Sequence, residues 1–229
     1  MNPLLILRDA WYFFSHNLGK LALLCLPLIL LESVVGFFVQ QQLVDSSEPS
    51  NAPMAYALLV GLMFSPFYKG ALILFMGSRH DGFYPSNAEI MRRVLSLWPA
   101  YALLSALSTL AVLSGLMIMV IPGLWLMIKL IFADFQLLLH GRAPMEAMRD
   151  SFNLTAGRFW PITASLLVTM LALSGPWLIL AWLVAPDGAI EPESGLSIVL
   201  QALMGFVQLF ATVVAFRIYT LIERKASHD

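Results

Sequence analysis

The fold is decided by residues 121–161, IPGLWLMIKLIFADFQLLLHGRAPMEAMRDSFNLTAGRFWP. Pro122 and Gly123 predict a tight turn, followed by a short apolar helix that Lys129 and Asp134 interrupt. Pro144, a residue type favoured at the first position of a helix, begins a basic amphipathic helix that leads into another apolar segment. Because the turn leaves almost no loop, we expect the short helix to run antiparallel to the apolar segment before it.

The composition of the chain is that of a membrane protein. Its 229 residues are 59% hydrophobic and only 12% charged, and the mean hydropathy is +0.81. A single cysteine, Cys25, excludes a disulfide framework within the chain. Asn2 and Pro3 open an aromatic stretch without a cleavage site for a signal peptidase, so we expect the first span to be retained.

Apolar runs long enough to cross a bilayer recur along the whole chain. Crossing takes about 20 apolar residues in a helix. We therefore predict an all-α polytopic membrane bundle, one integral membrane domain over residues 1–229, with six spans at 18–39, 54–76, 98–120, 124–140, 159–184 and 196–222.

Three amphipathic helices are expected at the cytoplasmic membrane interface. In the first, near the N-terminus, the apolar stripe consists of Leu4, Leu7, Trp11 and Phe14. The second begins at Ser86, because Ser86 and Glu89 have the spacing of a capping box. The third is the helix from Pro144. Each precedes a pair of spans, which indicates either a threefold repeat in one orientation or only the tendency of basic linkers beside a membrane to become amphipathic.

Basic residues fall on one side of this predicted topology. By the positive-inside rule, that side is cytoplasmic and carries both termini. The opposite loops, 40–53 and 185–194, hold acidic residues and no base. Twelve of the thirteen basic residues belong to the cytoplasmic side, namely Arg8, Lys20, Lys69, Arg79, Arg92, Arg93, Arg142, Arg149, Arg158, Arg217, Arg224 and Lys225.

Motifs of enzyme chemistry are absent from the sequence. It contains no zinc-binding H-E-x-x-H, no phosphate-binding loop, no dinucleotide-binding glycine pattern and no G-x-S-x-G elbow. Its four histidines lack metal-ligand spacing, so we expect no metal, no cofactor and no enzymatic activity. The basic residues are expected next to the membrane surface, which argues for phospholipids rather than nucleic acid as partners. Anionic lipid attracts each Lys or Arg at that surface by about 1 kcal/mol. The candidate headgroup contacts are Arg8, Arg92, Arg93, Arg142, Arg149 and Arg158.

Three charged residues inside predicted spans form the candidate polar site: Glu32, Lys129 and Asp134. Such residues usually face a bundle interior or a wet cavity. Lys129 and Asp134 are five residues apart, roughly 140° around a helix, so each needs a partner on another helix, and Glu32 can pair with Lys129. A buried structural pair, with Lys129 extending its amine toward water, and a substrate or proton path are the two interpretations.

The stretch quoted first resembles the YciC-like family of uncharacterised bacterial inner-membrane proteins and, more distantly, the membrane domain associated with some glycerophosphodiester phosphodiesterases. The resemblance rests on a P-G-[IL]-[WI] turn and an A-[LM]-R-x-S-x-x-L-[TV] run. The matching residues here include Pro122, Gly123, Trp125, Arg149 and Ser151. Asp134 departs from the apolar or small residues usual in that family. The resemblance implies a location in the bacterial inner membrane and no established activity.

Two hypotheses for the function follow. The first is a non-enzymatic membrane protein whose amphipathic helices bind anionic headgroups and support envelope or membrane organisation. The second is a transporter of a small solute or lipid, with a cavity lined by Glu32, Lys129 and Asp134. An intramembrane enzyme has less support, because no nucleophile and base form a set.

Overall fold

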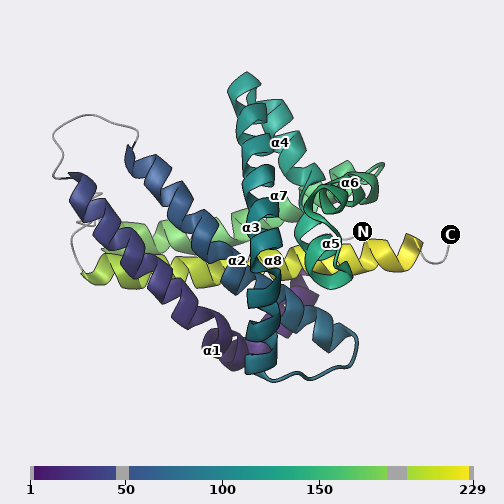
Figure 1. Ribbon diagram of the computed structural model, residues 1–229, viewed down its shortest axis with the longest axis horizontal. Helices are drawn as coiled ribbons and strands as arrows, with labels where there is room; N and C mark the ends of the chain where they lie inside the picture. Colours follow the sequence, from purple (N-terminus) through teal and green to yellow (C-terminus); the bar gives the residue numbers. More distant parts are fainter. Residues whose placement is uncertain (1–2, 45–51, 185–194, 227–229) are drawn as a thin grey trace.

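A computed structural model describes residues 3–44, 52–184 and 195–226 of the chain, with the side chains nearest to the gaps left out. Within these ranges the protein is all-α, as predicted, and contains no β-strand (Figure 1). The acidic loop residues of the topology prediction, Asp45, Glu48, Asp187, Glu191 and Glu193, lie outside the described residues. The helices are α1 (Pro3–Val44), α2 (Ala52–His80), α3 (Asn87–Ile118), α4 (Val120–Lys129), α5 (Ala133–His140), α6 (Pro144–Leu154), α7 (Phe159–Val184) and α8 (Gly195–Ala226).

Five segments of these helices are long and apolar enough to cross a membrane, and they correspond to five of the six predicted spans. They are Leu4–Val39, Leu58–His80, Asn87–Ile118, Val120–His140 and Ile198–Arg224. The remaining predicted span, 159–184, is the fifth along the chain and corresponds to α7. Within its described part, α7 reaches spanning length only together with α6, from which it is bent by 99°. The chain is therefore a multi-pass membrane protein, and its described residues hold five candidate spans, or six if this bent pair crosses as one.

Two of the three expected amphipathic helices are not separate elements. The segment at the N-terminus is the first part of α1, which continues without a break through Pro27 to Val44. The segment after Ser86 is likewise the first part of α3, which continues through Pro99. Its capping box is confirmed, because the Ser86 backbone N–H donates to Glu89 Oε2 at 2.8 Å and the Glu89 N–H donates to Ser86 Oγ at 3.3 Å. Of the three, only the helix from Pro144 is a separate element, α6.

The first turns of α1 pack against α8 through part of the predicted stripe and through residues beside it. Ile6, Ala10 and Phe14 are buried, and the Phe14 ring lies 5.6 Å from that of Phe206 and 5.7 Å from that of Phe210. Trp11, assigned to the apolar stripe, is 62% exposed. Its ring nevertheless lies 5.9 Å from that of Phe210, so Trp11 and Phe14 of the predicted stripe both contact α8, together with the buried residues that begin four-residue spacing at Ile6.

The chain reversal that we predicted at Pro122 and Gly123 occurs a few residues earlier. The direction of the chain reverses at Met119, an extended residue with φ −163° and ψ 155°, between α3 and α4. Pro122 and Gly123 belong to the first turns of α4, where proline costs no hydrogen bond. Gly123 is buried against Gly115 of α3, and a Cβ on Gly115 would lie 2.9 Å from the Gly123 Cα. Gly123 therefore allows α3 and α4 to cross closely, and it does not form a turn.

The fourth predicted span, 124–140, is a broken helix. α4 ends at Lys129, the chain turns through three residues, and α5 begins at Ala133. α5 is short but central: its Phe135 ring stacks 5.2 Å from the Tyr219 ring of α8, and Phe132, just before α5, is fully buried. Gly141 ends α5 in the left-handed conformation typical of a helix C-terminus. α5 therefore lies in the protein interior, which explains how an eight-residue helix fits a membrane protein.

Candidate functional site

A groove of about 290 Å³ lies between α2 and α3, and Asp134 of α5 also lines it. α2 contributes Leu58, Gly61 and Leu62 to its walls, so the groove is part apolar. Its polar lining consists of one cation, one carboxylate and hydroxyl groups: Ser65, Lys69, Tyr101, Ser105, Ser108, Thr109 and Asp134. The serine and threonine residues of α3 among them line an open space.

Asp134 is anchored at the end of the groove by two features of the fold. It lies in the first turn of α5, where the helix dipole favours a negative charge. The Tyr101 hydroxyl of α3 donates a hydrogen bond to Asp134 Oδ2 at 3.1 Å. Tyr101 is almost completely buried, so this hydroxyl has a fixed position. The carboxylate is thereby held toward the groove.

Lys69 is the cation of this site, and two carboxylates lie near it, beyond ion-pair distance. The Lys69 ammonium attracts the carboxylates of both Asp134 and Glu32. Glu32, on α1, accepts a hydrogen bond from the Tyr68 hydroxyl beside Lys69. Its carboxylate also lies next to Gly61, where an added Cβ would be 3.9 Å from Glu32 Oε1. Glu32, Lys69 and Asp134, from three different helices, therefore form one charged group.

The groove also contains a hydroxyl group that the protein does not satisfy. Ser108 Oγ is buried and has no hydrogen-bond partner among the described residues. A buried polar atom without a partner loses about 1–3 kcal/mol of hydrogen-bonding free energy, so such atoms are uncommon. A polar ligand atom or a water in the groove is the simplest partner for this hydroxyl.

The break between α4 and α5 is closed by one side chain of α6. Ser151 Oγ donates to the Lys129 carbonyl at 2.7 Å and accepts from the Phe132 N–H at 3.1 Å. Without this serine, two backbone groups would be unpaired inside the protein, which is costly at membrane depth. Ser151, one of the residues that carry the family resemblance, therefore supports the element that positions Asp134.

The structure does not bring the three predicted site residues together. Glu32 and Asp134 share a cation, but Lys129 is not in the groove lining. Its Nζ lies 5.6 Å from the centre of the Trp125 ring, whose edge meets Phe152 at 5.7 Å. Lys129 therefore makes a cation–π contact at the α4–α6 junction.

Sequence reasoning missed Lys69 because it assigned this residue to the cytoplasmic end of a span. Lys69 instead lies at the middle of the candidate span Leu58–His80, since α2 continues well beyond Pro66. The signal was present in the apolar run that follows Lys69, residues 70–77. A proline within a membrane helix does not mark its end, because neighbouring groups can satisfy the freed carbonyl.

The candidate headgroup contacts differ in their surroundings. Arg142 forms an ion pair with Asp150, with Nε 3.4 Å from Oδ2, and the Arg8 Nε is 4.0 Å from Asp9 Oδ1. Arg158 is half-buried. The remaining three, Arg92, Arg93 and Arg149, are exposed.

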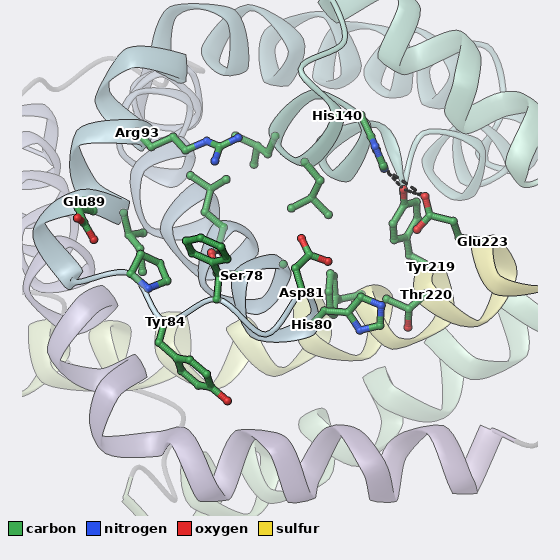
Figure 2. A pocket seen from close by; sticks show the side chains of 18 residues that line it. Ser78, His80, Asp81, Tyr84, Glu89, Arg93, His140, Tyr219, Thr220 and Glu223 are labelled. Carbon is green, nitrogen blue, oxygen red and sulfur yellow. Dashed lines mark hydrogen bonds and ion pairs between the residues drawn. The ribbon is translucent and has the colours of Figure 1, made fainter.

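A larger cavity, of about 760 Å³, lies where α2, α5 and α8 end and α3 begins (Figure 2). One wall is a hydrogen-bonded cluster in which the Tyr219 hydroxyl donates to Glu223 Oε1 at 3.1 Å. His140 Nε2 lies 2.7 Å from the same hydroxyl and 3.2 Å from Glu223 Oε1. This cluster ties the end of α5 to α8.

The chain matches no protein-family model, and no solved structure matches it. The candidate sites are therefore defined by their own side chains. The groove offers a cation, a carboxylate and hydroxyl groups, with the Glu32 carboxylate nearby, an arrangement that can bind a polar group and exchange protons with it.

Proposed function

We propose that this chain is a non-enzymatic transporter that moves a small polar solute or a lipid headgroup through the groove between α2 and α3. The observation that carries the proposal is the charged group of Lys69, Asp134 and Glu32 beside an open groove. Its location in the bacterial cytoplasmic membrane, with both termini cytoplasmic, is proposed from the basic residues and from the resemblance to YciC-like proteins.

The depth of the charged group supports a role beyond structure. Lys69 is eleven residues from either end of the span Leu58–His80, so it lies near the membrane centre. A lysine or aspartate there costs about 2.5–3.5 kcal/mol on insertion scales. A sealed ion pair would serve stability alone, but here the cation and Asp134 both line an open groove.

The broken span beside the groove supports the same proposal. Irregular backbone at membrane depth is tolerated only where protein buries it or where it lines a cavity. In many transporters, interrupted helices present their ends to the substrate near the midplane. Here the break after Lys129 places the start of α5, with Asp134, at the groove.

A labelling experiment tests whether the groove is wet. In a Cys25→Ala background, Ser105→Cys should react rapidly with a charged, membrane-impermeant thiol reagent in proteoliposomes. Leu103→Cys is the matched control, because Leu103 is on the same helix, is 53% exposed and does not line the groove. Equal, slow labelling at both positions would contradict a water-filled groove.

A genetic experiment tests transport. A strain that lacks the gene is compared with its parent for sensitivity to small polar solutes and for phospholipid composition. We expect the wild-type gene and Lys129→Met to restore the parental profile, and Asp134→Asn and Lys69→Met at equal protein level to fail. Full restoration by Asp134→Asn would contradict the proposed role of the groove.

A second candidate function is the binding of anionic phospholipid in support of membrane organisation. The observation that favours it is the exposure of Arg92, Arg93 and Arg149, together with Trp160, which is 78% exposed. Charge reversal of Arg92, Arg93, Arg149 and Arg158 should reduce the anionic lipid that remains bound in native mass spectrometry. Unchanged lipid binding would contradict this candidate.

A further inference from the structure

The larger cavity lies at the depth where lipid headgroups are found. His80 ends the candidate span Leu58–His80, His140 ends Val120–His140, and Glu223 is next to the end of Ile198–Arg224. All three line the cavity, as does Arg93 near the start of α3. Since spans end where the hydrocarbon core meets the headgroup region, the cavity opens into that region.

The cavity has an apolar side as well as a polar side. Leu74, Leu138 and Leu139 line it, and Leu139 closes it against Gly77, where an added Cβ would overlap the Leu139 side chain. Phe216 adds an aromatic surface. Apolar and charged walls in one cavity are suited to an amphiphile rather than to a small ion.

Two of the acids in the cavity are already engaged. Glu89 accepts from the Ser86 backbone N–H in the capping box of α3, and Glu223 accepts from the Tyr219 hydroxyl. Tyr84, at the mouth, is held by the Arg79 guanidinium, which lies 4.2 Å from the centre of its ring. These walls are therefore fixed by contacts within the protein.

Two charged side chains that line the cavity, Asp81 and Arg93, have no such partner among the described residues. Neither side chain has a hydrogen bond or an ion pair with any part of the chain that the structure describes. Figure 2 shows the Arg93 guanidinium, from α3, and the Asp81 carboxylate, from the turn after α2, both directed into the open middle of the cavity. The cavity thus presents one available positive and one available negative group.

We propose that this cavity binds the zwitterionic headgroup of an aminophospholipid, with Arg93 on the phosphate and Asp81 on the primary ammonium. Guanidinium and phosphate form strong, bidentate hydrogen bonds, and a primary ammonium can donate to a carboxylate. The lipid chains continue along the apolar side. This site is separate from the groove between α2 and α3, and it stands whether or not the groove carries a solute.

Titration of the purified full-length protein in maltoside micelles tests the proposal. The probes are dihexanoyl phosphatidylethanolamine, dihexanoyl phosphatidylglycerol and the chain-free headgroup glycerophosphoethanolamine. We expect Arg93→Gln to weaken binding of both lipids about tenfold, as loss of one charge-assisted contact implies. Asp81→Asn should weaken the ethanolamine lipid alone by a similar factor, because the glycerol headgroup has no ammonium.

Matched controls separate these effects from general changes of charge. Lys20→Gln removes an exposed cation on α1 that does not line the cavity, and Asp9→Asn removes an exposed carboxylate on the same helix. Both variants should bind like the wild type. Tight binding of the lipid alone identifies a membrane lipid, and equal binding of the chain-free headgroup identifies a soluble compound of the same chemistry. Absence of binding, or wild-type affinity of both Asp81→Asn and Arg93→Gln, would overturn the proposal.

Discussion

At the scale of single residues, the charged side chains of the spans divide into two kinds. Lys69 attracts two carboxylates that lie near it, whereas Lys129 has an aromatic ring as its neighbour. In a medium of low dielectric constant, a carboxylate without a cation is far more costly than a lysine that can extend its amine toward water. The two lysines should therefore differ in their contribution to stability.

We predict that Lys69→Met lowers the free energy of unfolding by about 1–3 kcal/mol, between the values of exposed and fully buried pairs. Lys129→Met should cost less than about 1 kcal/mol, the range of a cation–π contact. Titration of detergent-solubilised protein with SDS, followed by circular dichroism, measures both. Equal losses in the two variants would contradict the pairing of Lys69 with Asp134 and Glu32.

A second prediction concerns Ser151, which satisfies both backbone groups at the break between α4 and α5. Ser151→Ala should lower the free energy of unfolding by about 1–3 kcal/mol, because the Lys129 carbonyl and the Phe132 N–H lose their partner. Ser114→Ala is the control, since the Ser114 hydroxyl is exposed and bonds only within its own helix. The same SDS titration applies, and a Ser151→Ala variant as stable as Ser114→Ala would refute the role of this serine.

At the scale of elements, the crossing of α3 and α4 depends on two glycines. Gly115 and Gly123 meet so closely that a Cβ on Gly123 would lie 2.7 Å from the Leu116 backbone nitrogen. Backbone cannot move aside as a flexible side chain can, so a side chain here must separate the helices. Small residues that allow close approach are typical of helix pairs in membranes.

We predict that Gly123→Ala destabilises the protein by about 1–3 kcal/mol, the usual cost of overpacking. Gly36→Ala, in α1, is the matched control, because no atom lies within 4 Å of its Cβ and alanine favours a helix by about 1 kcal/mol. The control variant should thus be as stable as the wild type or more stable. The midpoint of thermal unfolding in detergent compares the two, and a stable Gly123→Ala variant would show that the crossing is looser than this geometry requires.

At the scale of the whole molecule, the number of spans decides on which side the C-terminus lies. Five spans place the two termini on opposite sides of the membrane, and six place them on the same side. The difference rests on whether α7, bent by 99° from α6, crosses the membrane. The distribution of basic residues favours the same side.

We predict that a fluorescent protein at the C-terminus is fluorescent in the bacterial cytoplasm, and that alkaline phosphatase fused after residue 48 or residue 190 is active outside it. Each reporter works on only one side of the membrane, so the three fusions together count the spans. An active phosphatase at the C-terminus would instead indicate five spans and would contradict the proposed cytoplasmic location of both termini.

The sequence alone determined that this is an all-helical protein of several spans, because length and hydrophobicity of each run suffice for that inference. It also determined the capping box at Ser86, since a cap is local in the chain. It identified Glu32 and Asp134 as residues that need an explanation, because any charge in an apolar run is costly.

Only the tertiary structure decided which charges meet. Glu32, Lys69 and Asp134 come from α1, α2 and α5, and their proximity depends on how these helices cross and on a break that Ser151 stabilises. The same holds for Asp81 and Arg93 in the larger cavity. Hydrophobicity and helical period are properties of one segment, whereas the pairing of side chains depends on the relative placement of several segments, which no single run of residues specifies.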